Sequence, residues 1–556
     1  MKIKYIIPVL VLALLACKNQ EEPTISEPEN EEVSMPFVWE NANVYFLLTD
    51  RFNNGNPDND INFERTRETA VLRGFEGGDL QGVTQKIESG YFNDLGVNAI
   101  WMTPIVEQIH GATDEGTGVT YGYHGYWTKD WTAIDPNFGT AEDLSALVSA
   151  AHSKGIRILL DAVINHTGPV TEIDPVWPEE WVRTEPKCEF QSYESTITCT
   201  LVKNLPDIKT ESNETVDLPP QLVEKWKAEG RYDEEVAELD AFFERTGHPR
   251  APRFYIMKWL TDYITDYGID GYRVDTVKHT EEFVWQEFKK ECDYSFAKYK
   301  EANPDKVLDD NPFYLVGEVY NYHITSANLF DMGDVKVDFY KDAFKSLINF
   351  DLKANADKQD YESLFSSYSK ILSNELKDYS VLNYITSHDD GSPYDKERAK
   401  PMKGANWLFF TPGASQIYYG DELARSLIIE GTQGDATLRS SMDWSQVESN
   451  ADVLAHWQKL GRFKSDHPAV GAGTHAKISD APYTFSRKFV LGDAEDKVVV
   501  GLDLPEGVKT LEVASVFDDG DVIRDAYSGE EVTVKDGSVT LNTKFNTVLL
   551  ETTNKK

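Results

Sequence analysis

Positive charge is scarce in this chain of 556 residues. It carries 55 lysines and arginines against 94 aspartates and glutamates, which gives a formal net charge of −39. Such a field repels polyanions, so we exclude binding to nucleic acid and electrostatic binding to anionic lipid. A solvated acidic surface explains most of this excess negative charge. The charge is also compatible with a neutral substrate and with divalent cations. Internal repeats and long low-complexity segments are also missing, and 40% hydrophobic residues indicate a globular protein.

Hydrophobic runs of membrane-spanning length are missing as well. After a basic start, the apolar run Tyr5–Ala16 is too short to span a membrane as a mature helix. We therefore interpret residues 1–17 as a signal peptide. The run ends Leu14-Leu15-Ala16-Cys17, which resembles a bacterial lipobox and implies that Cys17 is lipidated. The alternative is a simple cleaved signal with an incidental cysteine.

The residues behind Cys17 are polar and rich in Pro and Glu, and they predict a flexible tether over residues 18–40. We expect an exported bacterial lipoprotein of the outer membrane, on the cell surface or the periplasmic face. The pair Glu21-Glu22 favours the surface. A monomer is expected, in contact with the membrane only through its lipid.

Cysteine is rare, with four in the chain. Cys188 and Cys199 lie close together in an irregular stretch, and an exported protein can oxidise them to a disulfide. Cys292 has no partner by count and is expected to be a buried small hydrophobic residue.

Strand-like apolar runs alternate with amphipathic helical stretches from about residue 41 to about residue 460. Eight such runs predict a parallel (β/α)8 barrel, which carries its chemistry on the loops after the strands. The predicted strands are Val44–Thr49, Ala99–Met102, Ile156–Val163, Ile269–Val274, Phe313–Gly317, Leu347–Phe350, Val381–Ile385 and Gln416–Tyr419.

Two further regions interrupt or follow this alternation. Residues 167–250, between the third and fourth strands, are rich in Pro, Trp and Glu and predict an inserted subdomain. From Ala476 onward, short β-branched runs broken by Gly and Asp predict an antiparallel β-sandwich. The predicted order is signal 1–17, tether 18–40, barrel 41–166, inserted subdomain 167–250, barrel 251–465 and sandwich 466–556.

The fourth predicted strand delivers Arg273 and Asp275 to its end. The two residues are two positions apart, so their side chains leave the same face of the strand. A cation beside a carboxylate keeps it ionised and aimed, as a nucleophile requires. Because most Arg–Asp pairs in proteins are structural, the other strand ends must decide the function.

Three other strand ends carry matching chemistry. Asp161-Ala162-Val163-Ile164-Asn165-His166 follows the third strand, Gly317-Glu318 the fifth and Ser387-His388-Asp389 the seventh. Together with the Asp275 segment, and in this order, they resemble the four signature regions of the α-amylase family of glycoside hydrolases. Leu205-Pro206-Asp207 and Arg439-Ser440-Ser441-Met442-Asp443-Trp444 are similar to segments of bacterial periplasmic α-amylases.

The resemblance implies an activity: retaining hydrolysis of internal α-1,4-glucosidic bonds in starch, glycogen and maltodextrins through a covalent intermediate. It makes Asp275 the nucleophile, Glu318 the general acid/base and Asp389 the stabiliser of the transition state. Retention implies about 5–5.5 Å between the first two carboxyl groups. Acidic neighbours and partial burial should raise the pKa of Glu318.

The resemblance also implies a set of residues that bind the α-glucan. Tyr126 would be the aromatic platform under the sugar whose bond is cleaved. His124, His166 and His388 would form hydrogen bonds with that sugar. Lys278 and His279 would line the side of the site that holds the leaving group. The full set is Arg273, His124, Tyr126, Asp161, His166, Lys278, His279 and His388.

Calcium is implied at two places. Asn165, Asp207 and the main-chain carbonyl of His279 would hold one ion, since oxygen ligands suit a hard cation. The Asn-rich loop after the first strand resembles a second calcium loop found in cyclodextrin-forming relatives; an Asn/Gly turn without metal is the alternative. Its ligands would be Asn54, Asn56, Asn59, Asp60, the Gly77 carbonyl and Asp79.

Two alternatives to an endo-amylase remain. One is a maltooligosaccharide-processing hydrolase or α-glucanotransferase. It stays open, because the choice between water and a sugar as acceptor depends on loop shape. The form of Leu205-Pro206-Asp207 resembles α-amylases and not α-1,6-cleaving or mixed-specificity relatives, the Lys278-His279 pair also fits amylases, and a single C-terminal sandwich differs from cyclodextrin-forming enzymes. The other is a non-catalytic starch-binding lipoprotein, which the presence of all three acids disfavours. One departure from the family pattern is Asp390, an extra carboxylate beside Asp389, which we expect to face solvent.

Overall fold

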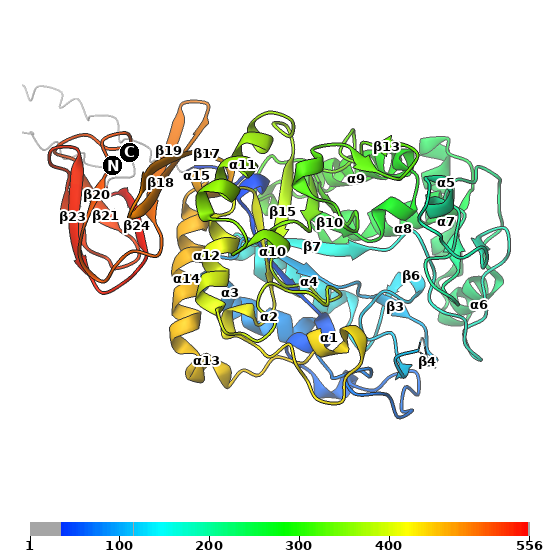
Figure 1. The fold of residues 1–556 in the computed structure, drawn as a ribbon. Coiled ribbons are helices and arrows are strands. Elements are labelled where there is room, and N and C mark those ends of the chain that lie inside the picture. The colour runs from blue at the N-terminus through cyan, green and yellow to red at the C-terminus, as the bar shows by residue number, and fades with distance from the viewer. Residues whose placement is uncertain (1–34, 115, 554–556) are drawn as a thin grey trace, which may run out of the picture. The chain divides into compact units, whose positions relative to one another are not determined.

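The computed structural model describes residues 35–114 and 116–553, and its centre is a closed barrel of eight parallel strands (Figure 1). Their order around the barrel is β1-β16-β15-β14-β11-β10-β7-β2. The predicted (β/α)8 barrel is therefore confirmed, and its strands are the eight apolar runs of the sequence. Their bounds are β1 (Asn43–Leu47), β2 (Ala99–Met102), β7 (Arg157–Ala162), β10 (Gly271–Val274), β11 (Tyr314–Gly317), β14 (Ser346–Asn349), β15 (Ser380–Tyr384) and β16 (Ala414–Tyr418).

Burial explains why these runs read as continuous apolar segments. Every residue of the eight strands is buried, as expected for a parallel sheet covered on both faces. A local signal marks the start of α4, where Thr140 and Asp143 form a capping box. The longer barrel helices are α2 (Leu80–Glu88), α4 (Ala141–Ser153), α8 (Pro252–Tyr267), α9 (Glu282–Ala302), α11 (Tyr361–Ser373), α12 (Pro401–Phe410) and α14 (Ala451–Asp466).

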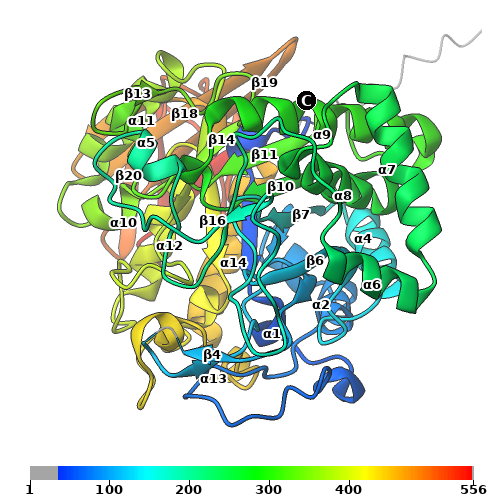
Figure 2. The same cartoon turned by 90° about the vertical axis from the view of Figure 1, so that its right-hand side faces the viewer.

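The stretch between β7 and β10 is more regular than the sequence suggested. Its first half is irregular, with β8 (Val182–Arg183), α5 (Glu194–Ile197) and β9 (Asp207–Ile208). Its second half forms α6 (Pro220–Glu229) and α7 (Tyr232–Thr246) (Figure 2). These helices bury a sparse apolar stripe under a Glu-rich outer face, which hides their period in the sequence.

The cysteine predictions hold where the structure describes them. Cys188 and Cys199 form a disulfide, and Cys292 is a free, fully buried thiol in α9. Cys17 lies outside the described residues, as does the predicted tether up to residue 34. At the end of that tether, Trp39 is only 4% exposed and stacks on Tyr314 with ring centroids 3.8 Å apart, so packing begins before residue 41. Within residues 35–114 and 116–553, no helix is both long and apolar enough to cross a membrane.

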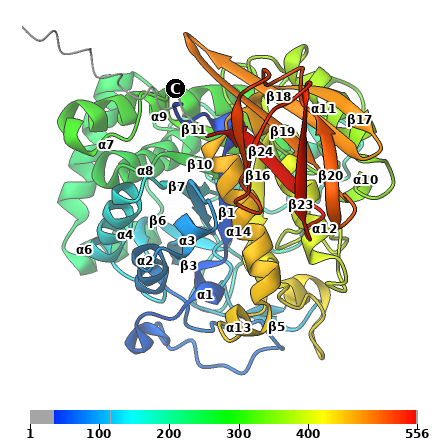
Figure 3. The same ribbon diagram turned by 90° about the vertical axis from the view of Figure 1, so that its left-hand side faces the viewer.

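The C-terminal region is the predicted antiparallel β structure (Figure 3). A six-stranded sheet and a two-stranded sheet share one apolar core, which includes Val499, Leu511, Leu541 and Leu550. The large sheet contains β17 (Thr474–Asp480), β18 (Tyr483–Leu491), β19 (Ala494–Gly501), β24 (Val548–Thr552), β21 (Val522–Asp525) and β22 (Glu531–Thr533). The small sheet pairs β20 (Gly507–Glu512) with β23 (Ser538–Thr543).

A buried charge cluster joins α14 to this sheet. His467, just after α14, places Nδ1 2.8 Å from Asp496 Oδ1 and Nε2 2.6 Å from Glu551 Oε2. Burial lowers the pKa of His467, but hydrogen bonds to the two carboxylates outweigh burial and raise this pKa to about 9. Since the folded value exceeds the unfolded value of about 6.5, the imidazolium stabilises the fold fully below pH ~6.5 and ceases to do so above pH ~9.

We therefore expect His467→Gln to lower the free energy of unfolding at pH 6, by up to about 3 kcal/mol. The loss should shrink as the pH approaches 10. Melting temperatures of wild type and variant across this range check the prediction. His475→Gln is the control, because burial and Arg487 lower the pKa of His475 to about 2 and keep it neutral throughout. A pH-independent difference between His467→Gln and wild type would contradict the argument.

Candidate active site

A cavity of about 530 Å³ opens at the carboxyl ends of the barrel strands. The three predicted acids line it: Asp275 follows β10, Glu318 follows β11 and Asp389 follows β15. A parallel barrel brings such strand ends together however far apart they lie in the sequence. The other lining residues are Arg73, His124, Tyr126, Trp127, His166, Phe190, Leu201, Val202, Leu205, Thr276, Lys278, His279, Tyr320, His388, Asp435 and Arg439.

One guanidinium group contacts three carboxylates beneath this cavity. Arg273 Nη1 lies 2.7 Å from Asp275 Oδ1 and 3.0 Å from Asp161 Oδ1, while Nη2 lies 3.0 Å from Glu318 Oε2. Arg273 is 1% exposed. Tyr126 Oη and Trp101 Nε1 both donate to Asp161 Oδ2, at 2.8 and 3.1 Å. Asp161 and Arg273 therefore lie one layer below the lining, where they position the acids and Tyr126.

The surroundings of Glu318 raise its pKa above that of an ordinary carboxyl group. Burial is the largest cause, and the charges of Asp275 and Asp389 act in the same direction. Together they outweigh Arg273 and raise the pKa of Glu318 to about 8. Its Oε2 also accepts a hydrogen bond from the Thr276 amide at 3.0 Å. At neutral pH Glu318 is thus protonated, as a general acid must be.

Tyr126 and three histidines form the floor of the cavity. The Tyr126 ring lies nearly parallel to that of His388, with centroids 5.4 Å apart, and to that of His124 at 5.9 Å. His166 Nε2 lies 3.2 Å from the Tyr126 carbonyl. Burial lowers the pKa of all three histidines, so they are neutral near pH 7. Neutral imidazoles can exchange hydrogen bonds with sugar hydroxyls without adding positive charge beside a developing cation.

Lys278 and His279 lie on a side wall rich in aromatic rings. Lys278 Nζ donates to the Tyr320 carbonyl at 3.2 Å and lies 5.3 Å from the centre of that ring. His279 Nδ1 lies 3.1 Å from the carbonyl of Thr196, inside the disulfide-closed loop. The same loop presents Phe190. Phe190 and Tyr320 are 51% and 50% exposed, so both rings are open to a ligand.

Three charged lining residues, Arg73, Asp435 and Arg439, were missed by the sequence analysis. Arg73 donates to Asp435 Oδ1 at 2.7 Å, and Arg439 Nη2 lies 2.5 Å from Asp435 Oδ2. Arg439 Nε also donates to the His388 carbonyl at 3.0 Å. Arg439 lies in a segment already recognised as similar to periplasmic α-amylases, which was the available signal. Arg73 offered none, because its partner is more than 350 positions away.

The expectation that Asp390 faces solvent was wrong. Asp390 is 7% exposed, accepts a hydrogen bond from Tyr384 Oη at 2.7 Å and forms an ion pair with Lys353. Asp389 lines the cavity, whereas Asp390 ties the loop after β15 to α10 (Leu352–Asn355) through Lys353.

We expect Lys353→Met to destabilise the protein by up to about 3 kcal/mol, because it leaves the buried Asp390 carboxylate without its cation. Unfolding in urea measures the loss. The double variant Lys353→Met/Asp390→Asn should recover most of it. Equal stability of the single and double variants would show that the pair carries no net interaction.

The residues of the first predicted calcium site converge. Asn165 Nδ2 lies 2.7 Å from Asp207 Oδ1 and 3.3 Å from the His279 carbonyl oxygen. Asp207 Oδ2 is buried without a hydrogen bond. An amide that can turn, a carboxylate and a carbonyl are the donor types that Ca²⁺ takes.

The second predicted loop is assembled only in part. Asn54 Nδ2 donates to Asp60 Oδ1 at 2.9 Å beside Gly77, and Asn59 Oδ1 is buried without a partner. The side chains of Asn56 and Asp79 already accept backbone N–H groups. Asn56 accepts one at the start of η2 (Pro57–Asn59), and Asp79 accepts those of Gly55 and Asn56 within the loop and one at the start of α2. Across residues 35–114 and 116–553, no group of three His, Cys, Asp or Glu side chains is placed to hold a metal.

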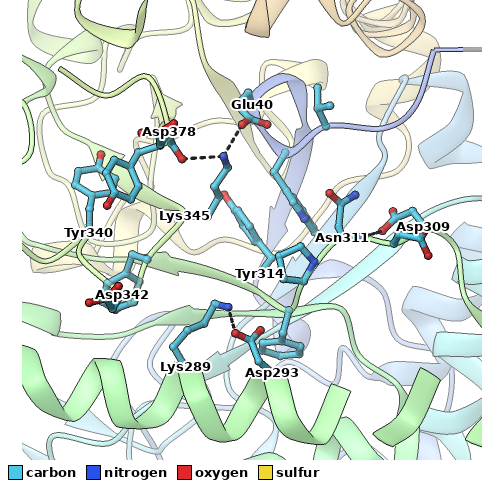
Figure 4. Close-up of a pocket in the computed structure, with 18 of the residues that line it drawn as sticks. Glu40, Lys289, Asp293, Asp309, Asn311, Tyr314, Tyr340, Asp342, Lys345 and Asp378 are labelled. Carbon is cyan, nitrogen blue, oxygen red and sulfur yellow. Dashed lines mark hydrogen bonds and ion pairs between the residues drawn. The ribbon is translucent and has the colours of Figure 1, made fainter. Parts of the chain in front are cut away.

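A larger cavity, about 1220 Å³, lies where the barrel strands begin (Figure 4). Its lining carries more acids than lysines, and two of the lysines are paired. Lys345 contacts Glu40 at 2.5 Å and donates to the Asp378 carbonyl at 3.1 Å, and Lys289 pairs with Asp293. We assign the chemistry to the smaller cavity, because the three acids line it.

Comparisons with known proteins agree with this assignment. The family model described as "Alpha amylase, catalytic domain" matches residues 46–468. The periplasmic alpha-amylase of Escherichia coli (strain K12) is 35% identical over 532 residues, 85% of this chain and 74% of that protein. A cyclomaltodextrin glucanotransferase of Thermoanaerobacterium thermosulfurigenes is 26% identical over 569 residues, 96% of this chain and 70% of that protein. A solved cyclomaltodextrin glucanotransferase with a three-domain ABC distribution shares the fold, with a TM-score of 0.63 at 22% identity, over 92% of this chain and 99% of that one.

Proposed function

Because the chain belongs to the α-amylase family of glycoside hydrolases, we propose that it cleaves internal α-1,4-glucosidic bonds of starch, glycogen and maltodextrins with retention of configuration. The observation that carries the proposal is the contact of Arg273 with Asp275 and Glu318 beneath the cavity. Arg273 contacts both acids, but burial and the neighbouring acids outweigh its charge at Glu318 and keep that acid protonated. A retaining glycosidase needs this division between nucleophile and acid.

Each acid then has a distinct step. Asp275 attacks the anomeric carbon while Glu318 gives its proton to the leaving glycosidic oxygen, which forms a covalent glycosyl-enzyme. Glu318, now a carboxylate, takes a proton from water as that water attacks the same carbon and releases Asp275. Asp389 holds the sugar hydroxyls, with Ser387 Oγ 3.2 Å from its Oδ1.

The remaining lining residues would hold the glucan on either side of the cleaved bond. Tyr126 would lie under the cleaved sugar, and His124, His166 and His388 would bond its hydroxyls. Lys278 and His279 would face the leaving group. Asp435, held by Arg73 and Arg439, adds a fixed acceptor to the lining.

Transfer to a second sugar is the alternative, and one observation favours it. Phe190 and Tyr320 are half exposed beside Lys278, where an acceptor sugar could stack in place of water. The relative from T. thermosulfurigenes is named for such a transfer. The number of C-terminal domains does not separate the two activities, because a solved cyclomaltodextrin glucanotransferase has a three-domain ABC distribution.

Product analysis tests the proposal. Protein lacking residues 1–17 is mixed with amylose and calcium, and proton NMR follows the products from the first seconds. We expect α-anomeric maltooligosaccharides of mixed length. β-Anomeric products would overturn the role of Asp275. Cyclic or elongated products would establish transfer, and binding without cleavage would establish a starch-binding protein.

For calcium, we propose that Asn165, Asp207 and the His279 carbonyl hold one ion, which would join the inserted segment to the barrel. Asn54, Asn59, Asp60 and Gly77 form a second candidate with Asn56 and Asp79. We further propose the division into barrel (41–166 and 251–465), inserted subdomain (167–250) and sandwich (466–556).

For location, we propose export as an outer-membrane lipoprotein anchored through Cys17. The name of the E. coli relative, a periplasmic alpha-amylase, supports export.

A further inference from the structure

A positively charged side chain lies against the central ligand of the proposed calcium site. β8 and β9 pair antiparallel, and their register places Arg183 directly opposite Asp207. Arg183 Nε lies 3.1 Å from Asp207 Oδ2, and the two side chains are 12% and 2% exposed. Since Asn165 occupies Oδ1, both carboxylate oxygens already face a protein group.

The contact between Arg183 and Asp207 is electrostatic and can be exchanged. Neither Arg183 Nε nor Asp207 Oδ2 makes a hydrogen bond of good geometry. The guanidinium has a second partner, because its Nη2 forms an ion pair with Glu211, whose side chain is 40% exposed. Arg183 can therefore leave Asp207 without losing every counter-charge.

A calcium ion that binds both oxygens of Asp207 competes with Arg183 for Oδ2. Ca²⁺ takes about six to eight oxygens and often binds a carboxylate through both of them. A guanidinium is charged at every accessible pH, so in this place it repels a divalent cation. A third acid, Glu281, is held nearby by Thr210 Oγ1 at 2.8 Å, and its other oxygen is buried and unpaired. The surroundings thus stay acidic when Arg183 swings away.

We propose that Arg183 is a built-in counter-cation for Asp207. It neutralises Asp207 and links β8 to β9 when calcium is absent, and calcium binds there by displacing it toward Glu211. This inference rests on the proposed calcium site and is independent of the proposed hydrolysis. The protein should therefore keep its fold in chelator and bind calcium weakly at this site.

Two substitutions with opposite effects test the inference, both made together with Asp60→Asn to silence the second loop. Arg183→Gln should bind calcium at least about tenfold more tightly than the parent, because the competing cation is gone. In EDTA its melting temperature should fall by several degrees, and calcium should restore it. Glu211→Gln should weaken calcium binding, because Arg183 then has only Asp207 as a partner.

Calorimetric titration of CaCl₂ and melting temperatures with EDTA or calcium give the readouts. Arg250→Gln is the matched control, since it removes a surface arginine paired with the exposed Asp240. Equal calcium affinity in the parent and in Arg183→Gln, including no binding in either, would overturn the proposal. So would tighter binding in Glu211→Gln. Loss of the calorimetric heat in Asp207→Asn would assign calcium binding to this site. Amylose cleavage is measured in a separate assay, so a failure of the calcium proposal can be distinguished from a failure of the proposed hydrolysis.

Discussion

Asp275→Asn is expected to lower kcat on amylose by about 10⁴–10⁶-fold, the scale seen when a covalent nucleophile is removed. The amide is nearly isosteric but cannot form the glycosyl-enzyme. It also removes a charge that Arg273 contacts at 2.7 Å, while Asp161 and Glu318 still hold that guanidinium in place. The fold and glucan binding should therefore persist, and steady-state kinetics with a binding titration check both.

The control for this experiment is Asp342→Asn at the opposite end of the barrel. Asp342 is exposed, and its positive φ of 57° is a conformation that Asn also tolerates. Wild-type rates in the control with lost turnover in Asp275→Asn support the assignment. Activity of Asp275→Asn within tenfold of wild type would move the nucleophile to another residue.

Glu318→Gln is expected to lower kcat by about 10²–10⁴-fold and to change the pH profile. The pKa of Glu318 is raised to about 8, so the wild type holds the required proton below that pH and loses it above. Its kcat/KM should fall as pH rises through about 8. Glu318→Gln cannot titrate, so its residual activity should lack this alkaline limb.

A substrate with an acidic leaving group separates catalysis from folding. Such a leaving group needs little protonation, so formation of the glycosyl-enzyme by Glu318→Gln should approach the wild-type rate. A burst of released phenol from an activated maltoside would record this step. Equal loss on activated and natural substrates would indicate a structural defect instead.

The sequence by itself determined the barrel and its acids. Each strand is a short apolar run that is buried on both faces. This pattern can be recognised in the sequence without knowing which strands lie beside it. Asp275, Glu318 and Asp389 follow such runs directly, so a parallel barrel had to place them on one rim. The raised pKa of Glu318 followed from that placement, although burial contributes more to it than the acidic neighbours do.

Only the tertiary structure decided which polar side chains share a partner. Arg273 joins Asp161 to Glu318, Lys353 takes Asp390 out of solvent, and Arg73 meets Asp435 across the cavity. Arg183 reaches Asp207 through a two-residue pairing of strands that no periodicity reveals. The physical reason is the distance along the chain over which each signal acts. Periodicity and strand-end position are properties of a short stretch of sequence. These ion pairs form between segments that are distant in the sequence, once the barrel closes and excludes water from between those segments.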